Sequence, residues 1–377
     1  MAWHRLGLAY ALNDRTNDLL SLADEAANHF GGALVFVHNV AKDLCCRREW
    51  SAIRYLAETI PATRREHAVA LYYAGCEHVV AGDHATALTW FHRFKQVVLS
   101  DFRSFPLDEP AFNLIFRQGV LVDDVKMTRL LNATVVPARK AVTFVGPVPD
   151  GPSPFVAAHV VDPRYFRRFA GELCAGHRAA GLSAPLHFHV AAADDGIAGE
   201  METLRAAYPD LALGFGWEAP GQWNHPVYYT CARFFVLEQL LDRYGRPVMT
   251  LDADILPGIS LPRIFDAARG ADFACFETGR DEPASVYQAS IMVFADGGRS
   301  RAFIADLSRF CVAKLGMPPA LSWMLDQAAL YSVLTQRAAD QPDFRFVALD
   351  KALAVSLDDA IRELATAEEK LAIISGR

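Results

Sequence analysis

The sequence predicts an α/β protein in which an all-α region precedes a domain built on a largely parallel sheet. Over the first third, small and apolar residues recur with a 34-residue period, a pattern typical of stacked helix pairs. After residue 155, short β-rich runs alternate with helical patterns, as in parallel α/β sheets. A proline- and glycine-rich stretch separates the two patterns. We therefore expect a helical domain at 1–135, a connector at 136–154 and an α/β domain at 155–377.

Composition is typical of a soluble globular protein. The chain has 377 residues, 52% hydrophobic and 21% charged, which argues against long disorder. A net charge of −7 argues against nucleic-acid binding. No apolar run approaches the roughly 18 residues of a membrane span, and the first residues lack the design of a secretory signal. The seven cysteines form no C-x-x-C pair, so we expect reduced thiols and a cytoplasmic protein.

The N-terminal repeats resemble the tetratricopeptide family. Residues 3–10 read W-x-x-L-G-x-x-Y, a first-helix signature, and residues 87–91 read A-x-x-x-F, a second-helix signature. Gly7, Ala41 and Gly75 share the 34-residue register at positions where two helices approach closely. About three repeats are expected over 1–101, with a further helix pair at 109–133. Their concave face is a candidate surface for a peptide or protein partner; a helical cap or a dimerisation surface is the alternative.

The expected elements of the second part follow from its periodicity and turn residues. Seven prolines and glycines between residues 135 and 154 predict an extended connector. The expected strands are 155–161, 186–190, 211–215, 248–252 and 272–276, and the expected helices are 163–180, 199–208, 227–243 and 260–269. Strands alternating with helices at this spacing predict a largely parallel sheet.

The most informative stretch is 248–254, an apolar run that ends in Asp252 and Asp254. A strand alternates its side chains, so the two carboxylates leave the same face, roughly 7 Å apart. Like charges at a buried strand end favour an added cation, and Mg²⁺ is often held by one or two carboxylates plus substrate phosphates. Ligands of such sheets bind at the carboxyl ends of strands. Because a D-x-D triplet also arises by chance, a solvated strand end is the alternative.

From about residue 155 onward, the chain resembles the nucleotide-sugar glycosyltransferases of the GT-A type. The resemblance rests on three elements in order, which are 228–234 (Y-Y-x-x-A-R-F), 244–256 (Y-G-x-P-V-x-x-L-D-x-D-I-L) and 323–330 (W-x-L-D-Q-x-x-L). In that family, a helix with an aromatic residue and an arginine precedes the D-x-D strand, and a helix carrying Asp-Gln follows it. The resemblance covers residues 155–377.

The resemblance implies a metal-dependent hexosyltransferase that moves a sugar from a nucleotide diphosphate, with UDP-sugars as the expected donors, to a hydroxyl acceptor on a glycan or protein. Asp254 is then expected to bind Mn²⁺ or Mg²⁺ directly, while Asp252 contacts the ribose or reaches the metal through water. The metal would stabilise the charge of the leaving diphosphate. Ala157 and Tyr229 are expected to line the nucleotide site.

Arg233 is expected to bind a phosphate through a charge-assisted fork; its alternative is a surface ion pair with Glu238 or another carboxylate. On the acceptor side, Asp326 is expected to take a proton from the attacking hydroxyl if the enzyme inverts. Gln327 would hydrogen-bond sugar or acceptor hydroxyls, and Trp323 would stack on a sugar. The alternatives are a helix cap for Asp326 and core packing for Trp323.

Two features fit this family less well. Members often complete the metal site with a late histidine, but no histidine follows His225. Residues 287–294 stand where many relatives have an Asn-containing turn, which leaves the donor sugar open. Separately from the family comparison, His187 and His189 share one face of a strand that we expect to be half-exposed. A pair at this spacing can bind a metal, but we expect both side chains to be solvated and assign them no role.

Two other functions compete with the glycosyltransferase. Haloacid-dehalogenase phosphatases also end an apolar strand in Asp-x-Asp, and would use Asp252 as nucleophile. They usually open their domain with that strand, whereas this triplet comes late and is followed by Ile255. The third possibility is a non-catalytic scaffold with a degenerate GT-A domain.

Overall fold

The computed structural model describes residues 2–100, 119, 121–122, 131–132, 141–149, 151–223, 225–255, 261–278, 280, 282–317 and 324–350. The chain forms two compact units, each described by itself below. The first comprises Met1–Arg129, Gly279–Val286 and Met317–Met324, and the second comprises Leu130–Thr278, Tyr287–Gly316 and Leu325–Arg377. After residue 278 the chain therefore enters the first unit twice and returns twice.

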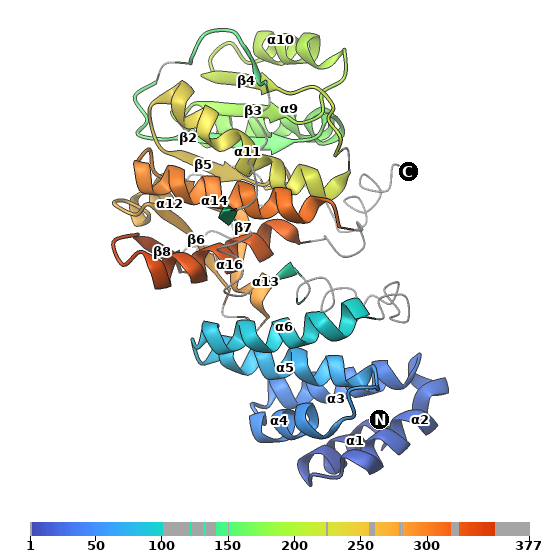
Figure 1. The fold of residues 1–377 in the computed structure, drawn as a ribbon. Coiled ribbons are helices and arrows are strands. Elements are labelled where there is room, and N and C mark those ends of the chain that lie inside the picture. The colour runs from blue at the N-terminus through green and yellow to red at the C-terminus, as the bar shows by residue number, and fades with distance from the viewer. Residues whose placement is uncertain are drawn as a thin grey trace. The chain divides into compact units, whose positions relative to one another are not determined.

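Residues 2–100 of the first unit form three successive helix pairs (Figure 1). The helices are α1 (Ala2–Leu12), α2 (Thr16–Phe30), α3 (Ala33–Cys46), α4 (Trp50–Thr59), α5 (Glu66–Val80) and α6 (His84–Ser100), and the short α13 (Pro283–Val286) also belongs to this unit. Packing explains the small residues of the repeat. A Cβ added at Gly7 would lie 2.8 Å from the Phe36 ring, and one at Gly75 would lie 2.8 Å from the Phe91 ring. Close helix approach is thus confirmed at both glycines. The helix pair expected at 109–133 and the boundary at 135 lie mostly outside the described residues.

Gly75→Ala is expected to destabilise the chain by about 1–3 kcal/mol, because the added methyl meets the fully buried ring of Phe91. The free energy of unfolding from urea titration measures the change. Gly171→Ala is the matched control: Gly171 lies inside helix α9 (Pro163–Ala179), and its added Cβ would meet no atom within 4 Å. The control should stabilise the chain by about 0.5–1 kcal/mol. Equal effects of the two substitutions would contradict the packing explanation.

The second unit is built on one eight-stranded mixed sheet in the order β1-β4-β3-β2-β5-β7-β6-β8. The strands are β1 (Thr143–Val145), β2 (Val156–Val161), β3 (Leu186–Val190), β4 (Leu213–Trp217), β5 (Val248–Leu251), β6 (Phe273–Glu277), β7 (Tyr287–Phe294) and β8 (Phe346–Leu349). β2 pairs in parallel with β3 and β5, and β3 pairs in parallel with β4. β7 runs antiparallel between β5 and β6.

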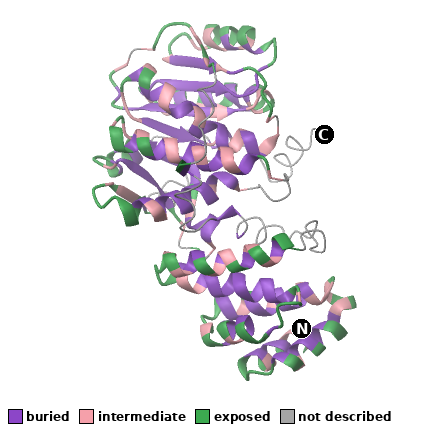
Figure 2. Ribbon diagram, viewed as in Figure 1, coloured by how far each residue is buried: buried purple, intermediate pink, exposed green. Residues whose placement is uncertain are grey.

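Helices cover both faces of the sheet (Figure 1). Helices α9, α10 (Ile197–Ala207) and α12 (Leu261–Ala267) supply Phe169, Ile197 and Ile264 to the core of one face. Helices α11 (Pro226–Tyr244), α14 (Gly298–Leu315) and α16 (Leu325–Asp340) pack against one another and contact β2, β5 and β7 from the other side. Figure 2 shows that the central strands are buried along most of their length, as in other doubly covered sheets.

The sheet is largely parallel, as expected, because β2, β3, β4, β5, β6 and β8 point in one direction. It is nevertheless mixed, since β7 runs antiparallel to both of its neighbours. The expected extended connector contributes strand β1, which pairs antiparallel with β4. Both pairings join segments far apart in the sequence, so local periodicity contains no signal for them.

The expected exposure of His187 and His189 is wrong. Both are buried, at 0% and 1% exposure, because helices cover the face that was expected to meet solvent. The Nδ1 atom of His187 lies 2.8 Å from the Tyr244 hydroxyl, and its ring lies 6.5 Å from that of His189. Burial, with His189 nearby, lowers the pKa of His187 well below its ordinary value.

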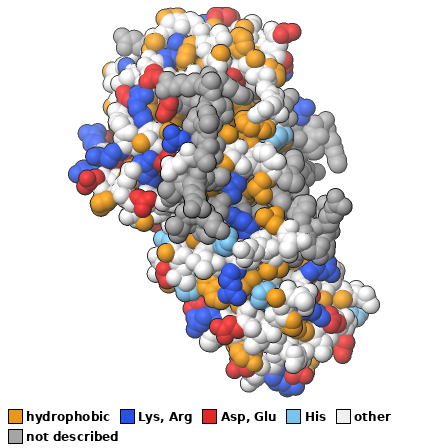
Figure 3. All heavy atoms as spheres, in the orientation of Figure 1, with side chains coloured by type: hydrophobic (Ala, Val, Ile, Leu, Met, Phe, Trp, Pro, Cys, Tyr) orange, Lys and Arg blue, Asp and Glu red, His pale blue; other side chains and the backbone are white. Residues whose placement is uncertain are grey.

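Within the described residues, no helix combines the length and apolar character required to cross a bilayer. On the visible face of the second unit, basic and acidic side chains are interspersed (Figure 3).

Candidate functional site

The strand order places a topological switch point at β2. From β2 the chain moves outward through β3 to β4, and α11 then leads it back to β5 on the other side of β2. In open α/β sheets, ligands bind outside the carboxyl ends of the strands at such a point. Asp252 directly follows β5, at this edge. The predicted carboxylates therefore stand beside the crevice that the topology creates.

Arg233 of α11 forms a buried ion pair with Asp252. Its Nη2 lies 2.7 Å from Oδ1 of Asp252, and the two side chains are 9% and 33% exposed. Its Nε donates to the Thr230 carbonyl at 2.9 Å, and its Nη1 to the Ala289 carbonyl at 2.7 Å. Burial opposes the charge, but the Asp252 and Asp326 carboxylates outweigh it and raise the pKa of Arg233. The guanidinium thus holds Asp252 in place, so Arg233 pairs with a carboxylate other than Glu238, and the pair is buried rather than at the surface. The expected fork to a phosphate stays a prediction.

Asp326 lies in the first turn of α16 and is only 6% exposed. Burial raises its pKa to about 6; Arg233 opposes this shift and Asp252 adds to it. The structure therefore brings Arg233, Asp252 and Asp326 together, and we call these three residues the charge cluster. A carboxyl with a pKa near neutrality can accept a proton in catalysis.

An irregularity in β7 supports the ion pair. The register between β6 and β7 shifts after Cys275, so that residues 289–291 have no partner in β6. We call these three residues the β7 bulge. The Ala289 carbonyl accepts from Arg233, and the Ser290 carbonyl accepts from the Asp252 backbone N–H at 2.9 Å. Bulges often occur beside active sites, where they redirect groups of a strand. Sequence reasoning did not find this support, because nothing in the local pattern signals the shift.

Tyr165 lies close enough to Asp254 and to two other carboxylates to be influenced by their charges. Tyr165, in the first turn of α9, has its pKa raised to about 12 by burial and by the carboxylates of Asp254, Asp162 and Asp252. Burial and Asp162 also raise the pKa of Tyr229 on α11. Tyr229, which is expected to contact the nucleotide, thus lies at the same edge of the sheet as Asp162. Tyr165 was missed, although an aspartate followed by proline after a strand is a helix-start signal that points to this turn.

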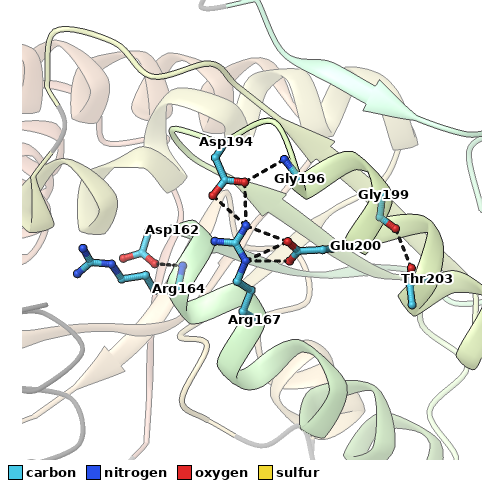
Figure 4. Close-up of polar contacts among 8 residues, drawn as sticks. All are labelled: Asp162, Arg164, Arg167, Asp194, Gly196, Gly199, Glu200 and Thr203. Atoms are coloured by element: carbon cyan, nitrogen blue, oxygen red, sulfur yellow. Dashed lines mark hydrogen bonds and ion pairs between the residues drawn. The ribbon is translucent and has the colours of Figure 1, made fainter. Parts of the chain in front are cut away.

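Hydrogen bonds and ion pairs join the loop after β3 to helices α9 and α10. Asp162 caps α9 by accepting from the backbone N–H groups of Arg164 and Tyr165, both at 2.8 Å. Figure 4 shows the Arg167 guanidinium between the carboxylates of Asp194 and Glu200, each 2.8 Å away. Asp194 follows β3, so this network fixes the loop on the β3 side of the crevice.

The remaining predicted residues are placed as follows. Ala157 is the second residue of β2 and is fully buried in the core, so the structure does not support its expected contact with a nucleotide. Gln327 is half-buried, and its backbone N–H donates to Asp326 at 2.9 Å. Trp323 lies outside the described residues.

The carboxylates of Asp252 and Asp254 could hold a metal ion only if oxygen atoms of the substrate supply the remaining ligands. The part of the chain that the structure describes contains no group of three or more His, Cys, Asp or Glu side chains arranged around a metal position. Asp252 is bound to Arg233, which leaves Asp254 as the better protein ligand. Mg²⁺ and similar cations accept one or two carboxylates when substrate phosphates supply the other ligands.

His159, near the end of β2, is fully buried, and backbone groups of Leu251 and Asp252 lie close to its ring. Its ring stacks on Phe188, with centroids 5.6 Å apart. Burial, with a smaller effect of His177, lowers its pKa to about 3. The folded chain thus holds this ring neutral, whereas the unfolded chain protonates it below pH about 6.5.

Acid should therefore destabilise the fold through His159, because only the unfolded chain gains the proton as pH falls below about 6.5. Between pH 7 and 4.5 the loss is about 2.5 kcal/mol from this residue alone. Urea unfolding at pH 7 and pH 4.5 should show His159→Leu losing about that much less stability than the parent chain. The exposed His29→Leu serves as the control and should keep the parent acid sensitivity. An unchanged acid sensitivity in His159→Leu would refute the assignment.

Comparison with models of known protein families gives no match. A search of curated proteins gives none either. Function must therefore be inferred from the residues of the site.

Proposed function

We propose that the chain is a GT-A-type glycosyltransferase that moves a sugar from a nucleotide diphosphate to a hydroxyl acceptor. One observation carries the proposal: Arg233, Asp252 and Asp326 converge beside the switch point of the sheet. They come from the three segments whose order in the sequence resembles that family. Nucleotides bind at such a sheet edge in other α/β proteins.

On the donor side, Asp254 would hold Mn²⁺ or Mg²⁺ together with the diphosphate of the donor, for which a UDP-sugar is our first choice. When bound, the metal stabilises the charge that develops on the leaving diphosphate. Asp252 remains fixed by Arg233 and faces the ribose. Tyr165 and Tyr229 would flank the nucleotide, since both lie at the edge that Asp162 and Asp254 define.

On the acceptor side, Asp326 would accept the proton of the attacking hydroxyl. Its burial keeps its pKa near 6, so the carboxyl is mostly ionised at pH 7 and binds a proton more readily than an exposed carboxyl does. Gln327, directly after it, would hydrogen-bond the acceptor. This assignment implies inversion of the anomeric configuration.

The first unit would supply a partner surface. Its three helix pairs fit the proposed tetratricopeptide-like arrangement, and we propose a peptide or protein as its partner. All seven cysteines are free, which supports a reducing compartment such as the cytoplasm.

Binding of nucleotide sugars, followed by thermal unfolding with and without Mn²⁺, tests the proposal. One donor at 100-fold its Kd should stabilise the chain by about 2.7 kcal/mol in the presence of metal. Asp254→Asn should abolish this metal-dependent stabilisation without changing the unfolding temperature of the free chain. Asp210→Asn, at an exposed ion pair with Arg178, is the matched control and should keep it. No response to any donor would favour the scaffold hypothesis.

The phosphatase alternative is less well supported by the site. A nucleophilic aspartate must approach a phosphorus atom, whereas Asp252 is bound to a buried arginine. Release of phosphate from a generic phosphomonoester, together with loss of that release in Asp252→Asn, would favour the phosphatase.

A further inference from the structure

Glu218 directly follows β4 at the carboxyl edge of the sheet, and it is only 3% exposed. Its backbone is held on both sides: the N–H donates to the Val190 carbonyl at 3.1 Å, and the carbonyl accepts from the Ala193 N–H at 2.8 Å. Val190 ends β3, and Ala193 lies in the loop after it. The carboxylate is therefore attached to a part of the chain that β3 and β4 fix together.

The Glu218 carboxylate accepts a hydrogen bond from the Tyr228 hydroxyl. Tyr228 lies near the start of α11 and is fully buried. Its ring stacks on those of Phe235 and Trp223, with centroids 5.8 and 6.4 Å apart. Burial and the neighbouring carboxylate raise the pKa of Tyr228 well above its ordinary value, so the phenol keeps its proton and remains the donor. The bond thus joins the end of β4 to the start of α11 inside the second unit.

A buried carboxylate is an unfavourable way to fill this space. Removing a carboxylate from water costs several kcal/mol, and apolar side chains of similar volume often stabilise a fold as well or better. What a carboxylate adds is direction, because a hydrogen bond requires a defined distance and angle between its partners. The Glu218–Tyr228 bond therefore fixes the start of α11 more narrowly than apolar packing does.

The start of α11 carries two residues of the candidate site. Tyr229 follows the buried tyrosine directly, and burial and the charge of Asp162 raise the pKa of its phenol. Arg233 lies one turn further along the helix, and its Nε donates to the Thr230 carbonyl within the same stretch. A displacement of the start of α11 would therefore move Tyr229 at the sheet edge and the guanidinium that holds Asp252.

We propose that Glu218 is a positioning residue. Through Tyr228 it fixes the first two turns of α11, and it so holds Tyr229 and the Arg233 guanidinium in place before a ligand binds. A site that is fixed in advance loses less free energy to ordering when the ligand arrives. The effect on ligand binding rests on the proposed function, whereas the effect on α11 does not.

Tyr228→Phe in the full-length chain removes only the donor hydroxyl and tests the positioning. Its matched control is Tyr208→Phe, which removes a hydroxyl that donates to the Gly171 carbonyl at 3.0 Å elsewhere in the same unit. Hydrogen exchange of the backbone amides of residues 231–234 reports on the first two turns of α11, because these amides donate to the carbonyls of residues 227–230. We expect them to exchange about tenfold faster in Tyr228→Phe than in the control, while amides of β3 exchange equally in both.

Two substitutions of Glu218 separate direction from packing. Glu218→Gln keeps an oxygen that can accept from Tyr228, so its amides 231–234 should exchange as in the parent chain. Glu218→Leu fills similar space without an acceptor, and should show the faster exchange even where its free energy of unfolding equals that of the parent chain. A merely structural role predicts exchange that follows the global stability instead. If Tyr228→Phe does not fold, the double variant Glu218→Leu with Tyr228→Phe replaces it.

Titration of the nucleotide sugars in the presence of Mn²⁺ gives a second readout. For a donor that binds the parent chain, Tyr228→Phe and Glu218→Leu should raise the Kd by about tenfold, while Tyr208→Phe and Glu218→Gln should leave it unchanged. Equal exchange of amides 231–234 in Tyr228→Phe and its control would overturn the positioning, as would an unchanged Kd in Tyr228→Phe. A chain that binds no nucleotide sugar but shows the expected exchange would refute the proposed function and leave the positioning of α11 intact.

Discussion

Replacing Arg233 by methionine is expected to destabilise the chain by about 3–5 kcal/mol, because it leaves Asp252 next to a buried region without its counter-charge. The substitution also leaves the Ala289 carbonyl without its donor. Because Arg233 lowers the pKa of Asp326, its removal should raise that pKa above about 6 as well. The loss of stability and the rise in the pKa of Asp326 thus both follow from removing the Arg233 guanidinium.

Urea unfolding at pH 7 measures the loss in Arg233→Met. Arg178→Met is the matched control: Arg178 pairs with Asp210 where the two side chains are 45% and 55% exposed, so its loss should cost less than about 1 kcal/mol. The double variant Arg233→Met with Asp252→Asn should recover part of the stability, since no charge is then left without a partner. A loss in Arg233→Met as small as in the control would show that the ion pair does not hold the site.

Much of the second unit could be predicted from local patterns. The strand expected at 186–190 is observed as Leu186–Val190, and the helix expected at 163–180 as Pro163–Ala179. Both are bounded by residues whose preferences act within a few positions, such as Asp162 and Pro163 at the start of α9. The α/β class follows from the same alternation and is confirmed.

Pairing and burial depend on residues far away in the sequence and could not be predicted. Residues 287–294 gave no sign of running antiparallel between β5 and β6. Likewise, the burial of His187 and His189 depends on helices that cover both faces of the sheet. A polar residue in a strand predicts exposure only where one face is open.

The charge cluster was partly predictable. The order of the motifs pointed to Arg233, Asp252 and Asp326, and the structure brings these three together. Their chemical partners were not predictable, because Arg233 binds a carbonyl of the β7 bulge and the bulge exists only through tertiary pairing. Ala157 was assigned to the nucleotide from its place in the first strand of the resembled fold and from its small size, a property that it shares with any core alanine.

Asp326→Asn is expected to separate activity from stability. Burial destabilises the ionised form of the Asp326 carboxyl and raises its pKa to about 6. A shift of about 2 units from the ordinary pKa corresponds to about 3 kcal/mol. Asparagine has the same shape, keeps an oxygen for the Gln327 backbone N–H, and carries no charge. The variant should therefore be as stable as the parent chain or more stable at pH 7. Its rate of sugar transfer should fall by about 10²–10⁴-fold, because no group remains to accept the proton.

The raised pKa of Asp326 also fixes the direction in which the stability of the fold changes with pH. The folded chain holds the Asp326 proton up to pH about 6, whereas the unfolded chain releases it near pH 4, so this residue makes the fold less stable as pH rises from about 4 to 6. Asp326→Asn should lack that component in urea unfolding measured across this range. Asp340→Asn, on the same helix but exposed, is the control and should keep it. Under the proposed function, sugar transfer by the parent chain should decline below pH about 6, as the carboxyl becomes protonated. Full activity in Asp326→Asn would exclude Asp326 as the proton acceptor.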